Sequence, residues 1–281
     1  MKNNEKEEAD MLKRLFDEEK ITAFGVLPFA ACRCRRPDLI ERRGLSADTI
    51  RSAILFLIPY YVKDGEGNIS LYARSGDYHA YSDALFSGLI PRLEAHFGER
   101  FLGYADKSPI EENVAASMAG LGRLGDNYML INETYGSFVF IGEILSTAAP
   151  EALGYDGTYG EVQYCMHCGA CKRACPMVIE GMACLSALTQ KKGALTDEER
   201  AYLKKYGSAW GCDLCQLACP LNRAVLDEGR ETPIDFFRKD RIARLTSARL
   251  AEMDGAEFKR RAFSWRGKAT LARNLEILEE T

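Results

Sequence analysis

The sequence predicts a mixed α/β (α+β) fold that is followed by a cysteine-rich module and a helical end. Residues 53–59 (AILFLIP) form an apolar run with the length of a buried strand. Residues 78–97 carry apolar side chains at helical spacing, and most cysteines lie between residues 165 and 219. With 281 residues, the chain can bury one full core and a second, smaller module.

Four further elements follow from local patterns. Residues 5–19 are expected to form an amphipathic helix, because Leu12, Leu15 and Phe16 share one face. Pro91 is expected to kink or break the helix at 78–97, and residues 111–121 predict another helix. Apolar runs at 128–131 and 137–145 flank the turn NETYG and predict a β-hairpin.

Eight of the ten cysteines form one pattern, and two of them precede a proline. This spacing is typical of two [4Fe-4S] clusters, in which the cysteine before each proline commonly ligates the other cluster. The rule assigns Cys165, Cys168, Cys171 and Cys219 to one cluster and Cys175, Cys184, Cys212 and Cys215 to the second. The pattern therefore predicts a bacterial-ferredoxin-like double-cluster module in an electron carrier or redox enzyme.

Two other uses of these cysteines fit less well. A disulfide framework requires an oxidising compartment, and the sequence opens without an apolar signal region. Zinc sites would favour separate four-ligand knuckles. Cys32 and Cys34 stand outside the pattern beside arginines, which could lower their pKa values and make them reactive, or they are surface thiols of no consequence.

The overall charge argues against a general nucleic-acid binder. The formal net charge is -4 and the pI about 5.6. A basic stripe nevertheless lies at Lys259, Arg260, Arg261, Arg266, Lys268 and Arg273, with Phe263 and Trp265 between them. This stripe either contacts phosphates and stacks a base or forms a solvated helix face.

Chain length, the position of the cysteine motif and the charged, helical end predict three domains, at 1–157, 158–225 and 226–281. Within the second domain, Thr196 and Glu199 form a capping box that predicts a helix at 197–206. No apolar stretch reaches the ~20 residues that span a bilayer, so no membrane partner is expected. Thiolate ligands require a reducing environment, which predicts a cytoplasmic protein.

Several strings, in order along the chain, resemble the bacterial epoxyqueuosine reductase family. They are YARSGDYH (72–79), ADKSPIEENVAASMAGLGRLGDNYMLIN (105–132), YGSFVFIGEI (135–144), CLSALTQKKG (184–193), YGSAWGCDLCQLACPLN (206–222) and SWRGK (264–268). The resemblance implies a cobalamin-binding domain similar to nitroreductases and reductive dehalogenases, at 1–157. It implies that epoxyqueuosine in tRNA is reduced to queuosine, with electrons from an external donor such as ferredoxin or flavodoxin.

The same resemblance implies roles for single residues. Asp106 matches the family's proton donor; alternatively it caps the following helix or ends a strand. The resemblance places the cobalamin contacts at Arg42 or Arg43, Ser70, Leu130, Ile141, Ser186 and Gly193. Core packing or turn geometry is the alternative for these positions. His79 resembles a cobalt-ligand signature, but we expect it to be structural or to face the substrate.

Two departures from the family bear on the substrate. The chain stops about where longer members begin HEAT-type repeats, so tRNA binding through the basic stripe should be weak, or the substrate a smaller modified nucleoside. Asp126 stands where members have lysine, which weakens any phosphate contact there. Two rival functions stay open: a corrinoid reductase of another small electrophile, and an electron-transfer adapter without corrinoid.

Overall fold

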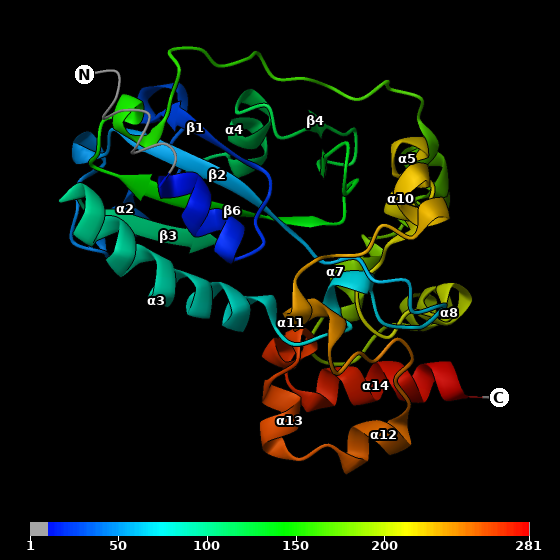
Figure 1. Ribbon diagram of the computed structural model, residues 1–281. Coiled ribbons are helices and arrows are strands. Elements are labelled where there is room, and N and C mark those ends of the chain that lie inside the picture. Colours follow the sequence, from blue (N-terminus) through cyan, green and yellow to red (C-terminus); the bar gives the residue numbers. More distant parts are fainter. Residues whose placement is uncertain (1–10, 281) are drawn as a thin grey trace. The chain divides into compact units, whose positions relative to one another are not determined.

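The apolar run at 53–59 is the core of β2 (Ser52–Pro59), a strand buried along its whole length. It lies within a four-stranded antiparallel sheet of order β1-β2-β6-β3 (Figure 1). The other strands are β1 (Phe24–Pro28), β3 (Phe101–Ala105) and β6 (Val139–Ser146). The mixed fold predicted from sequence is confirmed.

The structure, a computed structural model, describes residues 11–280. The chain divides into two compact units, Met1–Pro59 with Ser82–His167 and Tyr60–Tyr81 with Cys168–Thr281. These units are defined by contacts within the chain, and the segment 60–81 belongs to the second of them. The functional division at 157 and 225 stays a prediction.

Helices cover both faces of the sheet in the first unit. On one face, α4 (Glu112–Met118) packs against β2 and β6, and its Ala115 and Ala116 join the core around Leu55 and Leu57. The other face carries the ring of Phe56, which lies against Phe16 and Phe86 at centroid distances of 5.1 and 6.3 Å. Those rings come from a helix at residues 11–18 and from α3 (Tyr78–Phe97).

The first residues of the predicted helix at 5–19 lie outside the described part of the chain, and 11–18 are helical. The predicted helix at 111–121 is α4, which ends at Met118. A short α2 (Pro37–Glu41) follows β1. The turns include short 3-10 helices at Phe29–Ala31, Ala47–Thr49, Leu71–Ala73, Pro150–Leu153, Pro220–Asn222 and Ala262–Arg266.

The predicted hairpin at 128–145 is wrong. β5 (Leu130–Ile131) pairs with β4 (Arg123–Leu124) in a separate two-stranded sheet, whereas β6 pairs with β2 and β3. Only a bridge between Asn132 and Gly136 closes the turn. The long apolar β6 buries more surface in the central sheet than it would beside the two residues of β5.

The helix α3 continues through Pro91, so the break that was one predicted effect of this proline does not occur. Proline removes the hydrogen bond to the carbonyl four residues earlier, at Ser87. Both Pro91 and Ser87 are exposed, so water can satisfy that carbonyl.

Helices make up most of the second unit. They are α5 (Ala170–Ala174), α6 (Pro176–Glu180), α7 (Leu185–Thr189), α8 (Asp197–Tyr206), α9 (Leu214–Leu217), α10 (Arg223–Glu228), α11 (Asp235–Arg238), α12 (Ser247–Glu252), α13 (Gly255–Lys259) and α14 (Lys268–Glu279). The capping box at Thr196 and Glu199 begins α8 as predicted. No helix in residues 11–280 is both long and apolar enough to cross a membrane.

Two apolar cores hold this unit together. Trp210 is fully buried beside Phe263 and Leu271, and its indole nitrogen donates to the Tyr72 hydroxyl at 2.9 Å. A smaller core joins α7, α8 and α14 through Leu188, Leu203 and Ile277. The buried Asn274 amide links these parts, because it donates to the carbonyls of Thr189 and Ala209 at 2.7 and 2.9 Å.

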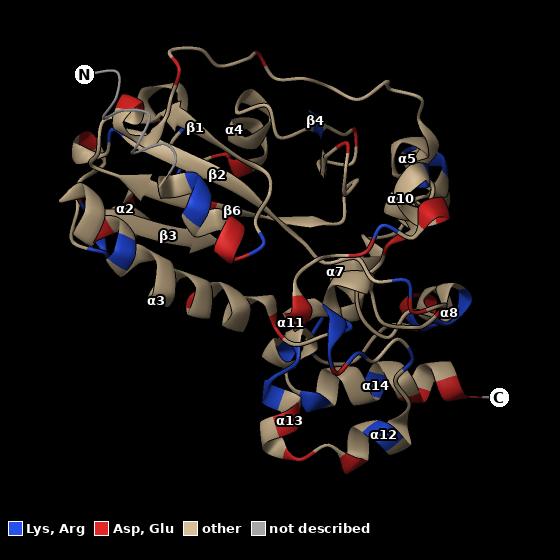
Figure 2. Ribbon diagram, viewed as in Figure 1, with Lys and Arg blue, Asp and Glu red and all other residues tan. Residues whose placement is uncertain are grey.

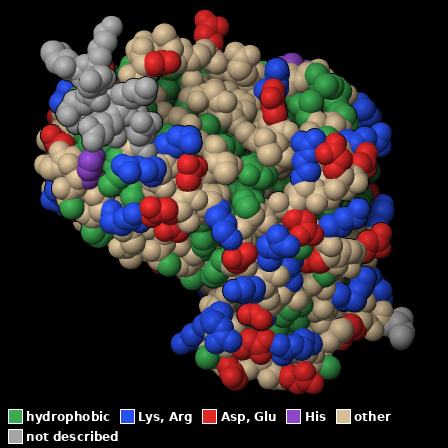
Figure 3. Space-filling model, viewed as in Figure 1, with side chains coloured by type: hydrophobic (Ala, Val, Ile, Leu, Met, Phe, Trp, Pro, Cys, Tyr) green, Lys and Arg blue, Asp and Glu red, His purple; other side chains and the backbone are tan. Residues whose placement is uncertain are grey.

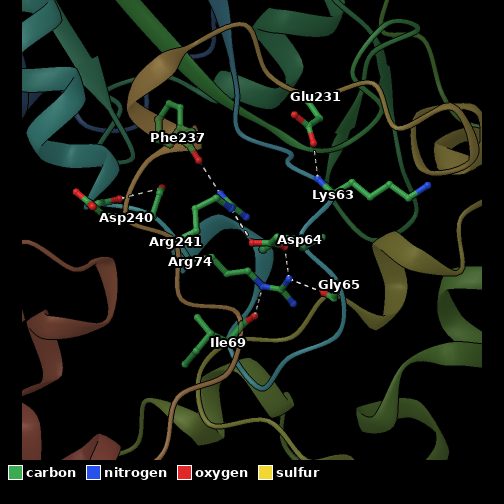
Figure 4. A network of polar contacts seen from close by, with 12 residues as sticks. Lys63, Asp64, Gly65, Ile69, Arg74, Glu231, Phe237, Asp240 and Arg241 are labelled. Carbon is green, nitrogen blue, oxygen red and sulfur yellow. Dashed lines mark hydrogen bonds and ion pairs between the residues drawn. The ribbon is translucent and has the colours of Figure 1, made fainter. Parts of the chain in front are cut away.

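A buried ion network fixes the segment 60–81 within the second unit (Figure 4). Asp64 accepts from the guanidinium groups of Arg74 and Arg241, whose side chains are 6% and 8% exposed. Arg74 also donates to the Ile69 carbonyl at 2.8 Å, and Arg241 donates to the Phe237 carbonyl at 2.7 Å. One carboxylate therefore serves two buried cations.

Candidate functional site

Short turns and helices position the cluster cysteines. Cys175 and Cys219 each precede a proline that begins a helix, α6 in one case and the 3-10 helix Pro220–Asn222 in the other. Proline suits this position because its fixed φ favours the helix and its missing N–H would have no partner in the first turn. Cys184 is the N-cap of α7. All ten cysteines are free thiols, so the donor set suits iron as the sequence predicts.

The thiols of the second unit interact electrostatically in two groups. Burial raises the pKa of Cys219, and Cys168 and Cys171 add to the rise. Burial likewise raises the pKa of Cys212 to about 11, with smaller contributions from Cys215 and Cys184. Iron binding requires the thiolate form, so an iron-sulfur cluster held here would displace protons from these thiols as it assembles.

Cys165, at the end of the first unit, lies in a group of three potential metal ligands. Its Sγ, an oxygen of Asp126 and a ring nitrogen of His167 lie within 4.8 Å of one another. His167 Nδ1 and Asp126 Oδ1 are 2.7 Å apart. Asp126 thus lies beside Cys165, a predicted cluster ligand.

Asp106 directly follows β3, is exposed and has a φ of 69°. This left-handed conformation is uncommon for residues other than glycine, although Asp and Asn adopt it more readily than most. Asp106 does not cap α4, because the N-cap of that helix is Glu111. It therefore stands at the end of a strand with its carboxyl accessible, as a proton donor to a ligand requires.

Two further carboxyls, both missed by the sequence analysis, lie near Asp106. Burial raises the pKa of Glu112 to about 7, and the charge of Asp106 adds to the rise. Burial raises the pKa of Glu143 to about 8, against the hydrogen bond donated by Ser108, and Glu112 raises it further. For Glu143, the signal in the sequence was its position as the single acid inside the apolar run FVFIGEIL.

Cys32 and Cys34 are partly buried against the core of the first unit, which corrects the expectation of surface thiols. Burial and then Glu143 raise the pKa of Cys32 to about 12, and burial also raises that of Cys34. The reactive, low-pKa alternative is therefore wrong. The neighbouring arginines pair elsewhere: Arg35 contacts Glu111, and Arg36 contacts Asp38.

The predicted cobalamin contacts in the first unit include both surface and core positions. Arg42 is exposed and pairs with Asp38, whereas Arg43 lies over the Tyr104 ring and donates to the Gly103 carbonyl. Leu130 and Ile141 are buried in the core, so only their backbone could meet a ligand. Because β3 ends at Ala105 opposite Gly142, residues 139–141 of β6 extend past the end of β3. That edge, next to Asp106, fits a backbone contact at Ile141.

The predicted contacts in the second unit already have protein partners. The Ser70 hydroxyl donates to Asp213, a partly buried acid between Cys212 and Cys215, and the Leu71 amide donates to the same carboxyl at 2.8 Å. The Ser186 hydroxyl accepts from Gln190 at 3.3 Å. Gly193 has a φ of 81° and its carbonyl accepts from Arg273. Asp213 is a residue that sequence reasoning missed.

His79 is half exposed at the start of α3, where its Nδ1 lies 2.9 Å from Asp77 Oδ1 and its ring stacks on Tyr78. This local pairing suits the structural role predicted for it.

The basic stripe is divided between the surface and the interior. Arg261 is buried and donates to the Asp240 carbonyl, and Arg273 donates to the carbonyls of Lys191 and Gly193. Lys259 and Arg260 are exposed, and the Arg266 guanidinium lies 3.7 Å above the ring of the exposed Trp265. Acidic and basic residues alternate on α12–α14 and mix over the visible face (Figures 2 and 3).

Comparison with known proteins identifies an iron-sulfur domain and a family for this chain. The 4Fe-4S binding domain family matches residues 163–178 and 206–228, which include seven of the eight predicted ligands and leave out Cys184. An epoxyqueuosine reductase of Gloeobacter violaceus is 34% identical over 225 residues, covering 75% of this chain and 69% of that protein. One of Pseudomonas aeruginosa is 31% identical over 195 residues, covering 66% of this chain and 50% of that protein.

Solved structures show the same fold. The epoxyqueuosine reductase of Streptococcus thermophilus superimposes with a TM-score of 0.71 at 24% identity, over 95% of this chain and 80% of that one. An epoxyqueuosine reductase solved with an epoxyqueuosine-modified stem loop of a tyrosine tRNA gives 0.72 at 22% identity, over 96% and 81%.

Fold and thiols together define an iron-sulfur protein with a mixed α and β domain. The chain belongs to the epoxyqueuosine reductase family, which is a family of oxidoreductases. The match covers 69% of the Gloeobacter protein but 60% and 50% of the relatives from Leadbetterella byssophila and Pseudomonas aeruginosa.

Proposed function

We propose that this protein reduces epoxyqueuosine in tRNA to queuosine, with two [4Fe-4S] clusters and cobalamin as cofactors. Membership of the epoxyqueuosine reductase family carries the proposal. The interacting thiol groups support the assignment of Cys165, Cys168, Cys171 and Cys219 to one cluster and the other four thiols to the second. The clusters would pass single electrons from an external donor such as ferredoxin or flavodoxin.

Cobalamin, when bound, supplies a low-valent metal centre that delivers the reducing electrons. Residues of this chain would hold it through backbone groups at Ile141 and Leu130 and through polar side chains at Arg42 or Arg43, Ser70 and Ser186, with Gly193 on the module's side. The contact at Ile141 is supported by the part of β6 that extends past Ala105, the last residue of β3.

Asp106 is the proposed proton donor. Removal of an epoxide oxygen requires protonation as the carbon–oxygen bond breaks, and a positioned carboxylic acid contributes about 10²- to 10⁴-fold to such a step. The exposed position of Asp106 after β3 allows contact with a substrate oxygen. Glu112 is the neighbouring acid whose charge interacts with that of Asp106.

The tRNA would contact the exposed part of the basic stripe, which comprises Lys259, Arg260, Lys268 and the Trp265–Arg266 pair. Arg266 on the Trp265 ring offers a cation and an aromatic face together, which suits a phosphate beside a base. Because Arg261 and Arg273 are used internally, fewer phosphates are contacted than the sequence suggests. Binding should then depend weakly on salt.

A defined reaction tests the proposal. Protein with clusters reconstituted under anaerobic conditions is mixed with cobalamin, a low-potential reductant and epoxyqueuosine-containing tRNA, and the nucleosides are measured by mass spectrometry. Conversion to queuosine is expected, and no conversion with both cofactors loaded would overturn the proposal. The free epoxyqueuosine nucleoside in a parallel reaction distinguishes tRNA from a smaller substrate.

A further inference from the structure

Glu143 is an acid in the middle of an apolar sheet face. On β6 it lies between Ile141 and Leu145 on the face that packs against α4, and its cross-strand partners are Leu55 and Tyr104. The residue is fully buried. Ser108 donates to its Oε2, whereas its Oε1 has no hydrogen-bond partner within residues 11–280. A buried carboxyl oxygen without a hydrogen-bond partner lowers stability, so its presence in the fold calls for a functional explanation.

Glu112, the first residue of α4, repeats this arrangement closer to the surface. Its Oε2 is also buried without a hydrogen-bond partner among the described residues. Glu112 interacts electrostatically with Asp106 and also with Glu143. The three carboxyls therefore form a series from the exposed end of β3 to the sheet interior.

The chemistry of the proposed function requires more protons than Asp106 holds. Converting an epoxide to an alkene consumes two electrons and two protons and releases the oxygen as water. One carboxylic acid can give one proton before it must be protonated again. A second acid beside Asp106 would supply that proton without waiting for solvent.

We propose that Glu112, with Glu143 as its reserve, reloads Asp106 with the second proton of each turnover. This inference rests on the proposed function. The Asp106 O–H bond breaks and its proton goes to the epoxide oxygen as the first carbon–oxygen bond opens. The Glu112 proton then passes to the Asp106 carboxylate, and Asp106 protonates the resulting hydroxyl, which leaves as water. The two electrons come from an external one-electron carrier, which is oxidised twice.

The neighbours of these acids support protonated carboxyls near pH 7. Tyr104 from β3 and Cys32 and Cys34 from the segment before α2 face Glu143, and burial raises the pKa of each. Among the cations of this region, Arg43 has its guanidinium carbon 5.3 Å from the Tyr104 ring centre, and Arg33 and Arg35 pair with Glu111. The pKa values of Glu112 and Glu143, raised to about 7 and about 8, allow both to hold protons at neutral pH.

Steady-state kinetics of E112Q test the relay, with E111Q as the matched control. Glu111 is the adjacent residue, and its carboxyl pairs with Arg35 away from the series. In E112Q, kcat should fall about tenfold to a hundredfold with KM unchanged, its solvent deuterium isotope effect should rise, and added formate should restore part of the rate. E111Q should match the wild type. A wild-type kcat and isotope effect in E112Q would overturn the relay alone.

Infrared spectroscopy supplies a readout that needs no turnover. The reconstituted protein is titrated while the band of protonated carboxyl groups is followed. Wild type should keep protonated carboxyls above about pH 6, where ordinary acids are ionised. E143Q should lose the component that titrates at the highest pH, and E112Q should shift that component to lower pH. No carboxyl titrating above about pH 6 would overturn the relay, whereas a wild type without turnover would overturn the proposed function and the relay with it.

Discussion

Asp106 combines an exposed carboxyl with a left-handed backbone, and Asn is the substitution that preserves both size and conformation. We expect D106N to fold normally, bind both cofactors and lose about 10²- to 10⁴-fold in single-turnover rate, because an amide cannot donate a comparable acidic proton. Rapid mixing of loaded enzyme with modified tRNA measures the rate, and iron and cobalamin contents serve as controls. Turnover of D106N at the wild-type rate would rule out the donor role.

Glu143 should make the stability of the protein depend on pH. In the unfolded chain it ionises near pH 4.5, whereas in the fold it keeps its proton until about pH 8. Unfolding therefore releases a proton within that window, so the free energy of unfolding falls as pH rises from about 4.5 to 8, by at most about 1.4 kcal/mol per pH unit.

E143Q removes this contribution. The variant should match the wild type near pH 4.5 and exceed it above pH 8 by on the order of 3 to 5 kcal/mol. Denaturant unfolding at pH 5 and pH 8.5 measures the difference, with E111Q as the control that keeps the wild-type dependence. Equal slopes in wild type and E143Q would mean that Glu143 is ionised in the fold.

Single residues were predictable where chemistry fixes a spacing. The eight thiols in a ligand pattern and the acid in a family phrase could be proposed from the sequence because their signals are local. Cys32 was misjudged because its pKa depends on Glu143, a residue more than a hundred positions away. The arginines beside it are neighbours in the sequence but pair with Glu111 and Asp38.

At the scale of elements, local capping was predictable and strand pairing was not. Thr196 and Glu199 are three residues apart and fix the start of α8 by themselves. The partner of β6 is instead chosen by burial against β2, some 85 residues earlier in the chain. An apolar run on either side of a turn resembles a hairpin, and only the tertiary fold shows that the runs belong to different sheets.

The ion network around Asp64 leads to a prediction for the segment 60–81. D64N leaves two buried guanidinium groups without their counter-charge, so it should lower the free energy of unfolding by about 3–5 kcal/mol. Urea unfolding of the isolated protein measures this loss. E228Q, which removes an exposed pair with Arg230, is the control and should change stability by under about 1 kcal/mol. An equal, small effect of both variants would show that the network contributes little.

For the whole molecule, the order of segments in sequence differs from their grouping in space. The segment 60–81 lies within the predicted first domain but makes its contacts with residues after 167. Asn68 shows how: its side chain and the Leu245 backbone exchange two hydrogen bonds of 2.8 Å. No local sequence pattern predicts contacts between residues 177 positions apart. The cluster module, the helical end and the family could instead be predicted, because their motifs are local in the sequence.

The assignment of Cys184 tests the cofactor content of the whole protein. It lies outside the segments matched by the 4Fe-4S binding domain family, yet it interacts with Cys212 as a member of the second group. C184S should lose that cluster and keep the other, so iron and sulfide per chain should fall from about eight to about four. C34S, which removes a thiol outside both groups, should keep the full content.

Iron and sulfide analysis with spin-resonance spectroscopy of the reduced proteins measures both variants. A reduced C184S protein should lose the signature of interaction between two clusters and show a single isolated one. Because the proposed function passes electrons from an external donor through both clusters, C184S should also be inactive with such a donor. Full iron in C184S together with loss in C34S would exchange the roles of these two cysteines and overturn the ligand assignment.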